Sequence, residues 1–200
     1  MLKQVALITL LGMSASAMAG QWQVKVGASS LAPSEDSNVL ADGAFTNVKA
    51  SQEYGFTPSV EYFFNDNFSA ELLLATPFKH DVTSNGAKIA SFKHLPPTIT
   101  AKYNFKNSTR FTPYVGVGAT VVIPWDEEIV IDGAKLDADV GYGVAGQVGF
   151  NFQPADAKNW GVFADVRYAD VKSELELNGN AIGDLEVNPW VYTLGYSYKF

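Results

Sequence analysis

The sequence contains no cysteine, which excludes a disulfide framework, a cysteine-ligated zinc site and a thiol nucleophile. It also has no excess of basic residues, because 21 acidic side chains outnumber 14 basic ones and the net charge is −7. A protein that binds nucleic acid through phosphate contacts needs the opposite balance, so we expect no nucleic-acid partner. Beyond the first twenty residues, no stretch approaches the run of about 18 apolar residues that a membrane-spanning helix requires.

Residues 1–19 have the composition of a secretory signal peptide. Lys3 supplies a positive charge, residues 5–11 are an apolar run, and Ala17-Met18-Ala19 provides the small residues of a cleavage site. We therefore expect an exported chain in which residues 20–200 form one domain. An exported chain of this kind is either a soluble periplasmic domain or a barrel in the outer membrane.

Four Asx-Gly dipeptides, spaced nearly regularly along the chain, predict the tips of β-hairpins. They are Asp42-Gly43, Asn85-Gly86, Asp132-Gly133 and Asn178-Gly179. Three other turn clusters lie between them, at residues 65–67, 106–109 and 153–156. Together the tips and turns divide the chain into eight passes.

Within the passes, apolar and polar residues alternate with the period of two that is typical of β-strands. In the last pass, Trp190, Tyr192, Leu194, Tyr196, Tyr198 and Phe200 alternate with Thr193, Gly195, Ser197 and Lys199. The polar face is mostly glycine, serine and threonine, whereas a soluble sandwich would need many charges there. Aromatic residues gather beside the three short turns, as in the interfacial girdle of a membrane barrel. The pattern predicts an all-β fold: an eight-stranded antiparallel transmembrane β-barrel with short periplasmic turns and long extracellular hairpin loops.

Several segments resemble the OmpW family of outer-membrane proteins. They are residues 71–78 (ELLLATPF), 94–98 (HLPPT), 113–118 (PYVGVG), 145–149 (AGQVG), 188–192 (NPWVY) and 195–200 (GYSYKF). The resemblance implies a barrel in the outer membrane of a Gram-negative bacterium that passes small hydrophobic molecules into that membrane. The C-terminal set Thr193, Gly195, Tyr198 and Phe200 also resembles the sorting signal that the barrel assembly machinery recognises.

Three prolines lie where the third pass ends and the fourth begins. Pro77, Pro96 and Pro97 lack backbone N–H donors, so the two neighbouring strands cannot pair fully at this height. We expect a gap in the barrel wall that lets solute leave sideways, an opening that the family resemblance also implies. The alternative is that these prolines only end the strands near the interface.

Inward-facing residues predict a hydrophobic gate above a polar plug. Parity places Leu73 and Phe163 on the inward face, and we expect Phe78 and Trp125 to contact solute above them. The resemblance implies an aromatic partner for Leu73 on the seventh strand, but that position is Arg167 here. Charged inward residues predict a plug that blocks straight passage, stabilises the barrel, or does both. They are Glu61, Glu71, Lys102, Asp165 and Arg167.

The remaining candidates for chemistry are weak. His80 and His94 are the only histidines, and no third ligand accompanies them at a suitable spacing, so we expect no metal site and no cofactor. No G-x-S-x-G or comparable nucleophile motif is present, so we expect no catalytic residue. Residues 126–128 (DEE) favour a solvated acidic turn, with a divalent-ion bridge to lipopolysaccharide as the alternative.

The sequence therefore favours a passive outer-membrane channel whose partners are small apolar solutes, membrane lipid and lipopolysaccharide. A structural, adhesive or receptor barrel that binds partners through its extracellular loops is the main alternative. An outer-membrane enzyme and a soluble periplasmic lipid-binding barrel are two further alternatives.

Overall fold

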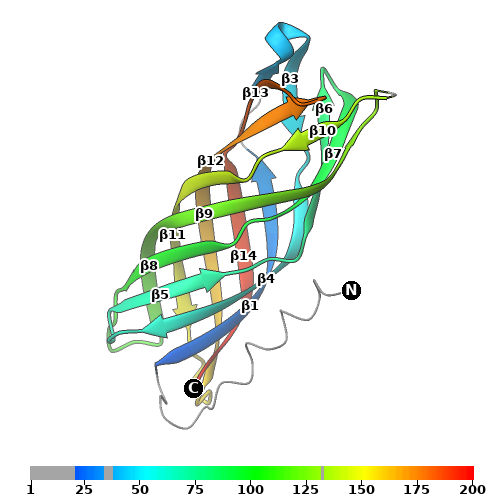
Figure 1. Cartoon of the computed structure of the whole chain (residues 1–200). Helices are drawn as coiled ribbons and strands as arrows, with labels where there is room; N and C mark the ends of the chain where they lie inside the picture. The colour runs from blue at the N-terminus through cyan, green and yellow to red at the C-terminus, as the bar shows by residue number, and fades with distance from the viewer. Residues whose placement is uncertain (1–20, 34–37, 132) are drawn as a thin grey trace, which may run out of the picture.

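Eight strands form a closed ring. The computed structural model describes residues 21–33, 38–131 and 133–200, so the expected signal peptide at residues 1–19 lies outside the described residues. The ring strands are β1 (Trp22–Pro33), β4 (Glu53–Phe63), β5 (Phe68–Leu73), β8 (Thr98–Asn104), β9 (Phe111–Ile129), β11 (Gly141–Phe152), β12 (Trp160–Leu177) and β14 (Pro189–Lys199). Each strand pairs antiparallel with the next in that order and β14 pairs with β1, which confirms the predicted barrel (Figure 1). Among the described residues, no helix has the length and apolar character that crossing a membrane requires.

Side chains of the ring strands alternate between an exposed apolar face and a buried polar face. In β8, Ile99 is 59% exposed whereas the neighbouring Thr100 is buried. On β9 and β14, Val117 and Leu194 are exposed to a similar degree. An apolar exterior of this kind suits contact with acyl chains, and a closed ring satisfies its backbone groups without water. The predicted outward orientation of the apolar rows is confirmed.

Aromatic side chains collect at two levels of the ring. The lower level lies beside the short turns at residues 64–67, 105–110 and 153–159. Its ring pairs, with centroids 4.8–5.1 Å apart, are Trp22–Tyr62, Phe68–Tyr103, Phe111–Phe150 and Tyr198–Phe200. The upper level comprises Tyr54, Tyr142, Tyr168, Trp190 and Tyr192. Two such girdles mark the two membrane–water boundaries, and aliphatic residues such as Val117 and Leu194 lie between them.

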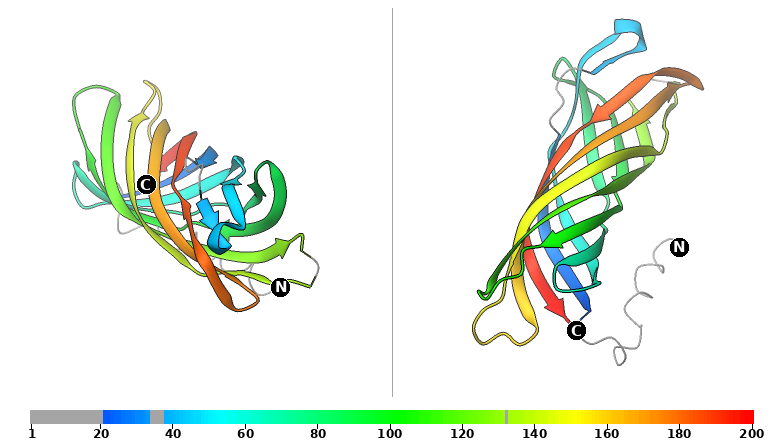
Figure 2. Two further views of the ribbon diagram at one scale, coloured as in Figure 1. Left: turned by 90° about the horizontal axis from the view of Figure 1, so that it is seen from above. Right: turned by 90° about the vertical axis from the view of Figure 1, so that its left-hand side faces the viewer.

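Above the upper girdle the hairpins continue as a smaller β-structure, here called the outer extension (Figures 1 and 2). Its elements are β2 (Asn38–Leu40), η2 (Ala41–Gly43), β3 (Phe45–Ala50), β6 (Phe78–Ser84), β7 (Ala87–Leu95), β10 (Leu136–Ala138) and β13 (Asn180–Val187). They pair with one another and with the upper parts of β9 and β12. A buried cluster that includes Val48, Val82 and Leu175 forms its core.

The predicted Asx-Gly tips close the hairpins of the outer extension. Asn85 and Asn178 have φ angles of 48° and 53°, and the glycine after each also has a positive φ. Two consecutive positive φ values are what the tight turns of two-residue hairpins require, and Asn followed by Gly adopts them at low cost. Asp42 and Gly43 show the same signs, while Asp132 lies outside the described residues.

Candidate functional site

The wall of the ring is interrupted at the height of the upper girdle. Pairing between β5 and β8 ends at Leu73–Thr98, and pairing between β6 and β7 starts at Phe78–His94. The prolines Pro77, Pro96 and Pro97 all lie in this interval. The structure thus brings the three predicted prolines together at a break in the ladder.

Backbone directions show which of these prolines face the break. The amides of Leu74 and Thr76 each donate to a carbonyl of β4 at 2.8 Å. Backbone groups of successive residues point to opposite sides of a strand, so the backbone nitrogen of Pro77 points away from β4, toward the break. The Pro97 carbonyl accepts from the Val121 amide of β9 at 3.0 Å. The backbone nitrogen of the preceding residue, Pro96, therefore points away from β9, toward the break. The missing donors of Pro77 and Pro96 therefore lie on the two edges that face each other.

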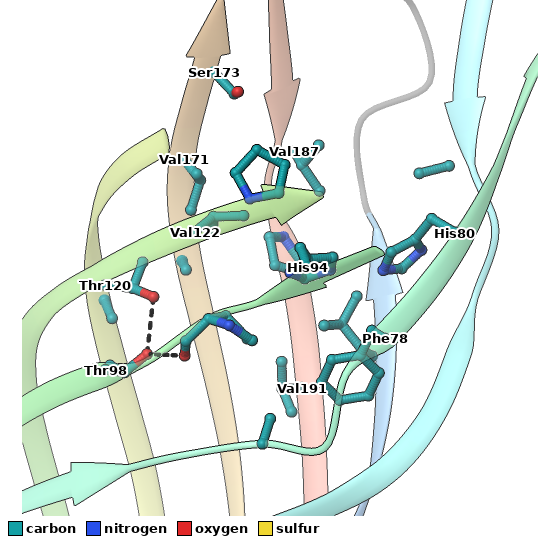
Figure 3. A pocket seen from close by; sticks show the side chains of 18 of the residues that line it. Phe78, His80, His94, Thr98, Thr120, Val122, Val171, Ser173, Val187 and Val191 are labelled. Carbon is teal, nitrogen blue, oxygen red and sulfur yellow. Dashed lines mark hydrogen bonds between the residues drawn. The ribbon is translucent and has the colours of Figure 1, made fainter. Parts of the chain in front are cut away.

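An apolar cavity borders this break on the inner side. Residues from both edges line it, including Leu73, Ala75 and Phe78 on one edge and Pro96 and Thr98 on the other. The rest of its wall is largely aliphatic and includes Leu31, Val122, Val171, Val187 and Val191 (Figure 3). Arg167 lines the same cavity from β12. A small apolar molecule in this cavity would lie directly beside the interrupted wall.

The structure separates the four residues predicted to form the gate. Leu73 and Phe78 line the apolar cavity, but Phe163 and Trp125 do not. Phe163 is buried lower in the ring, with its centroid 5.2 Å from Lys25 Nζ. Trp125 is half-buried on β9 at the height of the outer extension. Parity identifies the face of a strand but not the height along it, so Phe163 can share the inward face with Leu73 without lining the same cavity.

Below the cavity, charged side chains fill the lumen. The five predicted plug residues belong to this network and are at most 6% exposed: Glu61, Glu71, Lys102, Asp165 and Arg167. The Glu71 carboxylate lies 3.0 Å from Lys102 Nζ and 3.2 Å from Arg167 Nη2. Lys102 also contacts Glu61 at 2.9 Å, and Arg167 contacts Asp165 at 3.1 Å.

Sequence reasoning missed Lys25 and Tyr114, which also belong to the plug. Lys25 Nζ lies 2.6 Å from Glu61 and 3.8 Å from Glu71. The Tyr114 hydroxyl donates to Asp165 at 3.0 Å, and its ring centroid lies 3.8 Å from Lys102 Nζ. Lys25 lies on the same buried face of β1 as Ser29, so its inward position could be predicted from the alternation. Tyr114 is also buried between more exposed neighbours on β9, but an aromatic residue is expected on the apolar outer face rather than in a polar plug.

The plug is electrically balanced and lies between two separate cavities. Three cations, Lys25, Lys102 and Arg167, face three carboxylates, so the buried charges compensate one another. A separate polar cavity opens at the short-turn end of the ring, lined by residues such as Arg110, Asn151 and Lys199. The plug lies between this polar cavity and the apolar one, and an apolar solute would have to cross a layer of charges to go straight through.

The two histidines meet where the cavity enters the outer extension. His80 on β6 and His94 on β7 stack with centroids 4.9 Å apart and an interplanar angle of 18°. The outward side chains Lys79 and Lys93 at the same height show that this level lies beyond the hydrocarbon layer. Burial lowers the pKa of His94 to about 3, and burial also lowers the pKa of His80. Both imidazoles are therefore neutral at neutral pH.

The other predicted features are distributed over the barrel. In the C-terminal set, Thr193 is buried, Gly195 packs against β1, and the rings of Tyr198 and Phe200 lie on the outer face. In the acidic segment, Asp126 pairs with Lys93 at 3.0 Å and Glu128 accepts a hydrogen bond from Ser91 at 3.3 Å. Within residues 21–33, 38–131 and 133–200, no three His, Cys, Asp or Glu side chains gather as metal ligands would.

Comparison with known proteins identifies the family. The model of the OmpW family matches residues 18–200. Outer membrane protein W of Vibrio cholerae is 34% identical, covering 90% of this chain and 89% of that protein, and outer membrane protein W of Escherichia coli is 32% identical, covering 98% and 96%. The crystal structure of the outer membrane protein OprG from Pseudomonas aeruginosa is 29% identical, covers 92% of this chain and 97% of that chain, and superposes with a TM-score of 0.80. The chain therefore belongs to the OmpW family and is a β-barrel protein of the Gram-negative outer membrane.

Proposed function

We propose that this barrel is a channel for the passive uptake of small hydrophobic molecules. Solute enters the apolar cavity from the outer end, is stopped by the charged plug and leaves sideways between Pro77 and Pro96 into the membrane. The barrier that it overcomes is the polar lipopolysaccharide layer, which an apolar molecule crosses slowly because burying it among polar groups is unfavourable.

The observation that carries this proposal is that three features lie next to one another. The apolar cavity ends at the plug, the ladder breaks beside the cavity, and the outer face just below the break carries the exposed apolar residues Leu72 and Ile99. A closed floor and an incomplete side wall favour lateral exit over straight passage. The resemblance to the OmpW family also implies a lateral opening through which small hydrophobic molecules pass into the membrane.

Restoring the missing backbone donors tests the lateral exit. In Gram-negative cells that carry the Pro77→Val/Pro96→Val variant, we expect slower uptake of radiolabelled octane than in cells with the unchanged chain. The reason is that both edges regain N–H groups and can pair across the break. The measurement is the initial rate of uptake, with cells that lack the gene as the background.

Pro113→Val provides the matched control, because Pro113 lies in β9 near the short-turn end, far from the break. Uptake by this control should equal that of the unchanged chain. An unchanged rate in the double variant, in barrels that fold and reach the membrane normally, would overturn the lateral exit.

Two interactions of the chain with other molecules belong to the same proposal. The C-terminal set Thr193, Gly195, Tyr198 and Phe200 serves as the signal for the barrel assembly machinery, since its aromatic members remain accessible on the outer face. Lipopolysaccharide surrounds the outer extension, whose exposed surface carries ion pairs such as Lys88–Asp81.

A further inference from the structure

The wall of the apolar cavity contains an unusual group of four stacked rings. Phe78 and His80 are successive inward residues of β6, and Phe92 and His94 are successive inward residues of β7. Each histidine lies against a phenylalanine of the other strand, with centroids 5.8 Å apart for Phe78–His94 and 5.7 Å for His80–Phe92. His80 and His94 stack on each other at the centre (Figure 3). The imidazoles are thus fixed in place by packing.

The hydrogen bonding of His80 determines where its proton lies. His80 Nδ1 is 2.7 Å from the Ser51 carbonyl oxygen, which can only accept, so Nδ1 carries the proton. In the neutral ring, Nε2 then holds a lone pair and can only accept. This Nε2 is buried and has no hydrogen-bond partner among the described residues, and His94 Nδ1 is in the same situation.

A buried nitrogen without a partner is costly and calls for an explanation. Two hydroxyls that line the same cavity already donate within the protein, because Thr98 donates to Thr120 at 2.9 Å and Ser173 donates to the Asp139 carbonyl at 2.6 Å. Arg167 is held by Glu71 and Asp165, and its remaining Nη1 can donate but cannot accept. The cavity therefore offers an acceptor at His80 that the protein itself leaves unused.

The charged groups around the pair do not change this picture. Glu53 and Asp81 are the carboxylates that act on His80, but Glu53 accepts from Ser51 Oγ at 2.7 Å and Asp81 pairs with Lys88 at 2.6 Å. Besides burial, a charge on His80 would lower the pKa of His94 further. Two stacked rings in an apolar wall disfavour a proton on either, so the lone pair of Nε2 remains available.

We propose that the His80–His94 pair binds the hydroxyl group of amphipathic solutes, so that the cavity prefers apolar molecules that carry one terminal hydroxyl over purely apolar ones. The apolar body of such a solute fills the aliphatic part of the cavity, and its O–H donates to His80 Nε2. An ether of the same size has no donor and gains nothing from this nitrogen. This inference rests on the proposed uptake function, because it names the solute class for the same cavity.

The first test measures binding alone, in the unchanged protein. With the chain reconstituted in lipid bilayers and labelled with ¹⁵N at histidine, 1-octanol is added in one sample and its isomer 1-methoxyheptane in another. We expect 1-octanol to move the resonance of the non-protonated His80 Nε2 and the ether to leave it in place. Equal responses to the two isomers, or none to either, would overturn the proposal.

The second test measures selectivity in cells that carry the chain. Cells with the unchanged chain should take up 1-octanol roughly five-fold faster than 1-methoxyheptane. A roughly five-fold ratio is what the net contribution of one ordinary hydrogen bond gives. In His80→Phe, which keeps a ring between Phe78 and Phe92 but removes the acceptor, the ratio should fall to that of cells without the chain. Lys79→Gln is the matched control, because Lys79 lies on the same strand with its side chain on the outer face.

The two tests separate a failure of this inference from a failure of the channel. A resonance that responds to 1-octanol without any uptake refutes the channel and leaves the binding site. Uptake of both isomers at equal rates, with no resonance response, refutes the hydroxyl site and leaves the channel.

Discussion

Replacing Glu71 by leucine is expected to lower the free energy of unfolding of the barrel by about 3–5 kcal/mol. Glu71 is the carboxylate that touches all three cations of the plug: Lys102 at 3.0 Å, Arg167 at 3.2 Å and Lys25 at 3.8 Å. It also accepts a hydrogen bond from Ser59 at 2.6 Å. Without it, three buried cations share the two remaining carboxylates, Glu61 and Asp165, so one net positive charge stays uncompensated in the lumen. An uncompensated buried charge is among the costliest single changes.

Equilibrium unfolding in urea, followed by the gel mobility of the folded and unfolded barrel in lipid vesicles, measures this loss. Asp137→Leu is the matched control, because this substitution removes an exposed ion pair with Lys135 (2.7 Å). An exposed ion pair contributes at most about 1 kcal/mol to stability. If the two variants lost the same small amount of stability, the plug would not be a buried charge network.

The ring itself follows from local rules that a sequence displays. Period-two alternation sets which side chains face lipid, and Asx-Gly pairs such as Asn85-Gly86 set where the chain reverses. Both features act between near neighbours, so Ile99 outside and Thr100 inside were predictable from the order of residues alone. The presence of prolines on facing strands was equally readable, and the structure places them at one break in the ladder.

Features that depend on height along a strand, or on departures from regular pairing, were not readable in this way. Phe163 has the inward parity of a gate residue but lies beside Lys25, at a height that depends on strand tilt and register. Near Trp125, β9 carries an irregularity: Asp126 has a φ of 53° and the register with β7 shifts between Ser91 and Lys93. An irregularity of this kind breaks simple parity, so the loop aromatic Trp125 does not reach the cavity.

The pairing of the two histidines was also beyond a reading of the sequence. Adjacent residues point to opposite faces of a strand, so His80 lines the cavity whereas the next residue, Asp81, pairs with Lys88 at the surface. His80 and His94 are diagonal neighbours across the β6–β7 hairpin, and their contact depends on the register that the Asn85-Gly86 turn and the Val82–Thr83 irregularity create. A hairpin register one residue different would have sent one ring outward.

Replacing Val117 by lysine is expected to lower the free energy of unfolding of the membrane-embedded barrel by about 2–4 kcal/mol. Val117 is 71% exposed and lies on β9 between Phe111, at the lower girdle, and Val121, which pairs with Tyr142 of the upper one. In water an exposed valine tolerates lysine with almost no loss. In the middle of the hydrocarbon layer the ammonium group has no water to solvate it. This raises the free energy of the folded barrel but not that of the unfolded chain, in which the lysine is in water.

Val130→Lys separates these two environments within one stretch of chain. Val130 is 62% exposed, follows β9 directly and belongs to the outer extension, so its substitution should change the unfolding free energy by less than about 0.5 kcal/mol. Urea unfolding of both variants in the same lipid vesicles measures the difference. Two residues of one type and similar exposure then differ only in what surrounds them. Equal tolerance at both positions would mean that the exposed rows of the ring contact water, and a channel that delivers solute sideways into a membrane would have no membrane at its exit.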